Sequence, residues 1–124
     1  MIVGVGIELV DSVRFEAALE RFGERLCRRL FTSAERSGVG GGAGAALSLG
    51  ARFAAKVAAR RALGRPGLAW RDVEILREEA KPPGLRLRGQ ADAAARALGV
   101  SAVHLTLTHD AAHCIGQVVL EAGS

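Results

Sequence analysis

The chain has 124 residues, of which 49% are apolar. This is enough to bury one core, and we expect a single domain over residues 1–124. The chain carries 17 Lys and Arg against 13 Asp and Glu, and the resulting net charge of +4 favours anionic partners such as phosphates and acidic proteins. It has no Tyr, one Trp and four Phe, so it lacks an aromatic platform for stacking bases, which argues against nucleic-acid binding.

The chain opens on a strand-like pattern instead of the basic leader and apolar run of a signal peptide. No apolar stretch approaches the length of a membrane span. Cys27 and Cys114 are isolated, with no spacing that indicates a disulfide framework or a zinc ribbon. We therefore expect a protein of the reducing cytoplasm that makes no membrane contact.

The alternation from Ile2 to Val10 predicts a strand. One of its faces is apolar, and we expect that face to line the core. The other face carries glycines and Glu8, so we expect Glu8 to point away from the core near the end of the strand. Asp11 or Ser12 then supplies an N-cap for an amphipathic helix that we expect to run to about Phe22.

The middle of the chain contains a helix start, a loop and the longest predicted helix. Thr32 and Glu35 match a capping box, which predicts a short helix there. Residues 37–44 are rich in glycine and predict a flexible loop, because each glycine loses much backbone freedom on ordering. From Ala45 to Leu63 the apolar residues recur with helical spacing, and Gly64 supplies the stop.

The last third of the chain predicts two hairpins separated by a helix. Alternating residues on both sides of Pro82-Pro83-Gly84 indicate an antiparallel pair of strands. A short helix follows over residues 89–98, and two further strands, 103–108 and 114–120, are close enough in sequence to pair. The predicted class is α+β, with an antiparallel sheet packed on a long helix and on shorter helices.

One group of charged residues carries possible chemistry. Glu8 lies near the end of the first predicted strand, and the longest helix carries Arg52, Lys56, Arg60 and Arg61. A carboxylate beside several cations is most often an ordinary surface salt-bridge cluster. The same residues would also suit a divalent metal together with a polyphosphate, because Mg²⁺ is usually held by one or two carboxylates and by the phosphates of the substrate.

Four ordered segments carry a family resemblance. They are Gly6-Ile7-Glu8-Leu9-Val10-Asp11, Leu30-Phe31-Thr32-Ser33-Ala34-Glu35, Arg52-Phe53-Ala54-Ala55-Lys56 and Leu105-Thr106-Leu107-Thr108-His109-Asp110. Together they resemble the small holo-acyl-carrier-protein synthases, a class of 4'-phosphopantetheinyl transferases. The resemblance runs from the first predicted strand to the last, and it implies the 4'-phosphopantetheinyl transferase-like fold.

The resemblance implies a homotrimer with active sites between subunits, where coenzyme A and Mg²⁺ bind. A serine of an apo acyl carrier protein of fatty acid or polyketide biosynthesis would attack the β-phosphate of coenzyme A, and 3',5'-ADP would leave. Arg14 and Arg21, on the first helix, would dock the acidic carrier protein.

The resemblance also implies roles for individual residues. Glu8 would be the metal ligand, and Glu8 and Arg61 would be the catalytic residues. Arg52, Lys56, Arg61 and His109 would contact the phosphates of coenzyme A.

Five positions depart from the pattern of this family. Glu8 stands where the family has Asp, and Val57 stands where it has a second metal-binding Glu. Arg61 replaces a Lys, and arginine cannot act as a base because it stays protonated. Ala80 occupies a position where glycine is usual, and Thr106 one where serine is usual. A second hypothesis therefore stays open, in which the scaffold is repurposed and its inter-subunit cleft serves binding or a different small-molecule chemistry.

Overall fold

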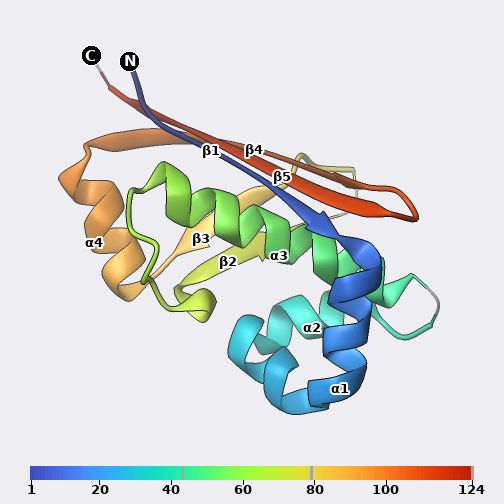
Figure 1. Ribbon diagram of the computed structural model, residues 1–124. Coiled ribbons are helices and arrows are strands. Elements are labelled where there is room, and N and C mark those ends of the chain that lie inside the picture. Colours follow the sequence, from blue (N-terminus) through green and yellow to red (C-terminus); the bar gives the residue numbers. More distant parts are fainter. Residues whose placement is uncertain (43, 79, 124) are drawn as a thin grey trace.

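The computed structural model describes residues 1–42, 44–78 and 80–123 (Figure 1). Helices and strands follow one another along the chain in an α+β pattern, as predicted. The elements are β1 (Ile2–Asp11), α1 (Ser12–Leu30), α2 (Ser33–Val39), α3 (Ala45–Ala62), the 3-10 turn η1 (Trp70–Asp72), β2 (Val73–Leu76), β3 (Gly84–Leu87), α4 (Gly89–Ala97), β4 (Val100–His109) and β5 (His113–Ala122).

The long helix α3 lies between two antiparallel sheets. β1, β5 and β4 pair in that spatial order, and the hairpin of β2 and β3 forms a separate two-stranded sheet. Figure 1 shows the three-stranded sheet along one side of α3 and the β2–β3 hairpin along another, with α1 and α2 gathered beyond one end of the helix. Within the described residues, no helix combines the length and the apolarity that crossing a membrane requires.

The sheet and α3 approach closely because both surfaces carry small residues. The helix presents a row of buried alanines to the core, among them Ala55 and Ala58. A Cβ added to Gly6 of β1 would overlap the carbonyl oxygen of Ala58, and one added to Gly116 of β5 would overlap the backbone at Ala55. These two glycines therefore permit the close packing of strand on helix.

The buried face of β1 is the opposite of the one predicted. Gly6 is buried against α3, whereas the side chains of Val5, Ile7 and Leu9 are 55–57% exposed. The expectation that the apolar face lines the core and that Glu8 points away from it was wrong. Glycine packs against the helix because the space there has no room for a side chain.

α1 continues beyond the predicted end at Phe22 and reaches Leu30. Its path breaks at Gly23, whose φ of 59° and ψ of −141° are not helical. The predicted N-cap is present, since Asp11 Oδ1 accepts a hydrogen bond from the backbone N–H of Arg14 at 3.0 Å. Glycine tolerates this backbone conformation at little steric cost, so the chain can turn and continue as a second helical segment.

Candidate active site

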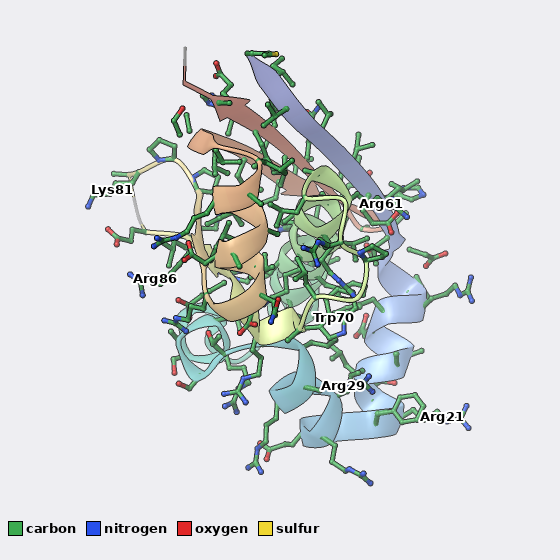
Figure 2. All side chains as sticks on the ribbon, turned by 90° about the vertical axis from the view of Figure 1, so that its left-hand side faces the viewer. Arg21, Arg29, Arg61, Trp70, Lys81 and Arg86 are labelled. Carbon is green, nitrogen blue, oxygen red and sulfur yellow. The ribbon has the colours of Figure 1, made fainter. Side chains whose placement is uncertain are left out.

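Glu8 and Arg61 form an ion pair between β1 and α3. Arg61 Nη1 lies 3.2 Å from Glu8 Oε1, and it also donates a hydrogen bond to the carbonyl oxygen of Ile7 at 2.7 Å. The backbone N–H of Leu9 donates to Glu8 Oε1 at 3.0 Å. The Glu8 side chain is 23% exposed and that of Arg61 54%, so the pair is open to solvent on one side (Figure 2).

The residues around Glu8 do not fit a resident Mg²⁺ ion. Val57 lies one turn before Arg61 on the same side of α3 and offers no oxygen. In residues 1–42, 44–78 and 80–123, no group of three His, Cys, Asp or Glu side chains could hold a metal. Mg²⁺ prefers near-octahedral oxygen ligands, and the Glu8 carboxylate already binds a guanidinium. The predicted metal ligand thus holds an organic cation in this structure.

A second cationic region lies around Arg52. Two adjoining pockets, of about 170 and 380 Å³, share Ser48, Arg52 and Arg77, and we call them together the Arg52 groove. The smaller pocket extends to His109 and the larger one to Lys81. Glu78 also lines the larger pocket and pairs there with Lys81 at 2.9 Å. Cations nevertheless predominate in both linings, and this charge suits a ligand that carries phosphates.

Arg52 itself is held rigidly at the wall of this groove. The residue is buried, and its Nη1 donates to the carbonyl oxygen of Ser48 at 3.2 Å. Burial lowers the pKa of its guanidinium, the neighbouring Arg77 lowers it further, and Glu35 opposes both. Within the described residues Arg52 Nε is buried without a hydrogen-bond partner.

The Glu8–Arg61 pair and the Arg52 groove lie on opposite sides of α3. Arg52 and Arg61 are nine residues apart on the helix, which is about two and a half turns at about 3.6 residues per turn. The sheet register agrees, because Glu8 is paired with Gly116 and Gly116 with Leu107, which lines the groove. α3 packs against the sheet at Gly116, the middle residue of the row Glu8, Gly116 and Leu107. Within one chain, α3 therefore lies between Arg61 and His109.

Lys56 lies inside the protein instead of at a ligand site. Its Nζ lies 2.8 Å from Glu35 Oε1 and donates to the carbonyl oxygens of Trp70 at 2.9 Å and Val73 at 2.6 Å. The side chain is wholly buried, and burial lowers the pKa of its ammonium group while Glu35 opposes the shift. The prediction that Lys56 contacts coenzyme A stays a prediction. Its placement argues against this contact, because the ammonium group already has three protein oxygens as partners.

Arg14 and Arg21 are both exposed on α1. They are seven residues apart and therefore lie on one side of the helix segment. Arg21 also lies over the ring of Phe22, with 5.3 Å between its guanidinium carbon and the ring centroid. Figure 2 shows Arg21 extending outward from the first helix, so a charged partner can reach it.

Two cations of the Arg52 groove were not predicted from the sequence. Arg77 follows the short strand β2, and Lys81 lies in the turn that leads to β3. Both approach Arg52 only because the β2–β3 hairpin folds back beside α3. The sequence showed that both residues follow a predicted strand, but it did not show how close that strand lies to α3.

No family model matches the chain. Curated relatives do match it over nearly its whole length. It is 51% identical over 112 residues to holo-[acyl-carrier-protein] synthase of Beutenbergia cavernae, with 90% of each chain covered. The chain belongs to the holo-[acyl-carrier-protein] synthase family. The enzyme of that name from Frankia alni is 44% identical over 122 residues, with 98% of each chain covered.

Solved structures of holo-[acyl-carrier-protein] synthases share the fold. That from Neisseria meningitidis superposes with a TM-score of 0.87 at 24% identity, covering 98% of this chain and 99% of the other, and it supports the fold alone. That from Bacillus anthracis, solved in complex with CoA (3',5'-ADP), has a TM-score of 0.79 at 29% identity, with 99% of each chain covered. The predicted α+β 4'-phosphopantetheinyl transferase-like fold is confirmed.

Proposed function

We propose that residues 1–124 form a single domain that transfers 4'-phosphopantetheine from coenzyme A to a serine of an apo acyl carrier protein. Membership of the holo-[acyl-carrier-protein] synthase family over nearly the full length carries this proposal. The Arg52 groove and the guanidinium of Arg61 support it, because both offer positive charge to a ligand rich in phosphate.

The proposed reaction is a displacement at phosphorus. The serine Oγ forms a bond to the β-phosphorus of coenzyme A, and the bond from that phosphorus to the bridging oxygen breaks. The bridging oxygen keeps the electron pair and leaves as part of 3',5'-ADP, and the serine proton passes to water or to a nearby base. Positioning and electrostatic stabilisation supply most of the catalysis in such transfers, so fixed cations are the main requirement.

The four cations predicted to touch coenzyme A take different roles in this proposal. Arg52 and His109 contact phosphates from the Arg52 groove, which both residues line. Arg61 contacts the diphosphate beside Glu8. Lys56 acts through structure, since it ties α3 to Glu35 and to the backbone at Trp70 and Val73.

We further propose that the protein works as a homotrimer with each site shared by two subunits. Within one chain α3 separates Arg61 from the groove of Arg52 and His109, so a single ligand needs the groove of one subunit beside the Glu8–Arg61 pair of the next. The exposed apolar face of β1 around Ile7 favours burial between subunits. The number three comes from the family resemblance alone.

Arg14 and Arg21 are proposed to dock the acyl carrier protein. Both are exposed on one side of α1, and a positive surface guides an acidic partner toward the site. The cytoplasmic location expected from the sequence stays a prediction.

The test is to incubate the protein with coenzyme A and a panel of apo carrier proteins, with and without Mg²⁺, and to weigh the carriers by mass spectrometry. A gain of the phosphopantetheine mass on a serine supports the proposal. A variant with that serine changed to alanine is the control and should gain nothing. No gain on any carrier under either condition would overturn the proposal.

A repurposed scaffold is the second candidate, and Val57 beside an engaged Glu8 favours it. In this case the same surfaces would bind an anionic small molecule other than coenzyme A. The two candidates differ in calorimetry with coenzyme A, because the transferase must bind it and the repurposed protein need not.

A further inference from the structure

The Glu8 carboxylate holds a cation that belongs to the chain itself. Arg61 Nη1 donates to Glu8 Oε1 at 3.2 Å and to the carbonyl oxygen of Ile7 at 2.7 Å, so both hydrogens of this nitrogen have protein acceptors. A guanidinium carries five N–H donors in a rigid, planar arrangement. Two anchors on one nitrogen therefore fix the plane of the whole group.

The rest of the guanidinium remains available to a ligand. No hydrogen bond from Arg61 Nη2 or Nε is present within the described residues, and the side chain is 54% exposed. These two nitrogens form the edge that binds two oxygens of a phosphate in parallel. Figure 2 shows Arg61 at the surface between α3 and β1, where a ligand can approach this edge.

A divalent cation would have to displace this arrangement. It would compete with the guanidinium for the Glu8 carboxylate, and Val57 would offer no ligand in return. Losing the ion pair would also free the guanidinium to repel the metal at short range. The local residues therefore favour the built-in cation over a bound metal.

We propose that the anchored guanidinium of Arg61 takes the place of a divalent metal, so that this protein binds the diphosphate of its substrate without Mg²⁺. The inference rests on the proposed function for the identity of the substrate, coenzyme A. It extends that function, because it makes diphosphate binding independent of metal and dependent on one arginine. Glu8 then acts as a positioning residue that orients Arg61.

The first experiment is calorimetric titration of the native protein with coenzyme A, once with excess EDTA and once with excess Mg²⁺. We expect dissociation constants that agree within about threefold, which is less than 1 kcal/mol. Arg61→Ala should weaken binding about 10- to 100-fold under both conditions, the usual effect of losing charge-assisted hydrogen bonds. Arg61→Lys should retain the charge but recover only part of the affinity, because it has no bidentate edge.

Two controls separate this effect from general charge and from folding. Arg96→Ala removes an equal charge from α4, where Arg96 pairs with Asp92 on the surface, and should leave affinity unchanged. Thermal unfolding of each variant checks that the fold is retained. Glu8→Gln should weaken coenzyme A binding less than Arg61→Ala, since the hydrogen bond of Arg61 to Ile7 remains.

A matched pair of double variants tests whether Mg²⁺ binds once a second carboxylate replaces the anchored guanidinium. Val57→Glu with Arg61→Ala places a second carboxylate beside Glu8 and removes the competing cation, so Mg²⁺ should now strengthen coenzyme A binding and should bind by itself in a direct titration. Val57→Gln with Arg61→Ala has the same shape without the charge and should show neither effect.

The outcomes distinguish the inference from the function on which it rests. Binding that is absent in EDTA and restored by Mg²⁺ would overturn the inference, even if the carrier proteins are modified. Equal binding in both conditions with no modification of any carrier would support the inference and contradict the proposed transferase activity. Absence of binding in both conditions would overturn the inference.

Discussion

Lys56 Nζ and Glu35 Oε1 lie 2.8 Å apart in the interior of the protein, and both side chains are wholly buried. The pair joins α3 to the start of α2, where the same carboxylate closes a capping box with the backbone of Thr32. Glu35 Oε2 accepts a hydrogen bond from the backbone N–H of Ile75 at 3.0 Å. A single ion pair therefore connects two helices and the strand β2.

Lys56→Met should destabilise the protein by about 3–5 kcal/mol, because it leaves the Glu35 carboxylate buried without its counter-charge. Urea unfolding followed by circular dichroism measures the change. Lys81, the other lysine of the chain, forms an exposed pair with Glu78, so Lys81→Met is the matched control and should change stability by less than about 1 kcal/mol. Equal effects of the two substitutions would contradict this account of Lys56.

Gly6→Ala should destabilise the protein by about 1–3 kcal/mol or more, because the new methyl group overlaps the carbonyl oxygen of Ala58 and forces β1 from α3. Gly41→Ala is the control, since nothing lies within 4 Å of a Cβ built there. The control should be neutral or slightly stabilising. Thermal unfolding of both variants measures the change in stability. An unchanged melting temperature in Gly6→Ala would show that the contact with Ala58 can relax.

Ala80→Gly should stabilise the protein by up to about 1 kcal/mol. Ala80 has a φ of 63°, in the left-handed region that costs a residue with a Cβ about 1–2 kcal/mol. The gain is reduced by the greater freedom of glycine in the unfolded chain. Ala111→Gly, at an exposed loop residue without positive φ, should instead lower the melting temperature. A lower melting temperature in both variants would argue against strain at Ala80.

Ile7→Lys should convert the proposed trimer to monomers, because it places an unpaired charge in the apolar face of β1 that the subunits would bury. Analytical ultracentrifugation measures the mass. Leu98→Lys, at an exposed position just after α4 and outside the β1 face, should leave the assembly intact. The expected loss of transfer activity in Ile7→Lys follows from sites shared between subunits, and an unchanged mass would refute this role of the β1 face.

Asp110 contributes to the pH dependence of stability. The backbone N–H groups of Ala112 and His113 donate to its Oδ1 at 2.8 and 2.7 Å, and these bonds lower the pKa of the carboxyl group. Because the folded pKa lies below the unfolded value of about 3.9, this stabilisation is complete above that pH and is lost as pH falls through the folded pKa.

Asp110→Asn keeps an oxygen acceptor and removes the titration. The difference in unfolding free energy between native protein and variant should therefore be constant near neutral pH and should shrink on the acid side of about pH 4. Urea unfolding at a series of pH values measures it. A difference that stays constant through the acid range would contradict the assignment.

Local patterns in the sequence predicted most elements correctly. The alternation over residues 2–10 and the capping box at Thr32 and Glu35 are both confirmed. The long helix, predicted to Leu63, ends at Ala62, and the two hairpins pair as expected. Each of these features depends on residues close together in sequence. α1 ran past its predicted end because one glycine interrupts a helix that tertiary contacts then continue.

The candidate site was harder to predict, because its residues meet only after folding. The sequence placed Arg52 and Arg61 on the same predicted helix, but it did not show which side of that helix would face the sheet. Arg77 gave no local signal, since its approach to Arg52 depends on where the β2–β3 hairpin lies. Lys56 looked like a ligand-binding cation in sequence, and its burial against Glu35 became visible only in the structure.

The sequence by itself determined the order of helices and strands, the family and the absence of a carboxylate at Val57, because these depend on local spacing and residue identity. The tertiary structure decided that the glycine face of β1 is buried, that Lys56 is buried in an ion pair with Glu35 and that Arg61 pairs with the Glu8 carboxylate. Those outcomes depend on which surfaces fit closely together, and the alternation of a strand defines its two faces without stating which one another element will cover.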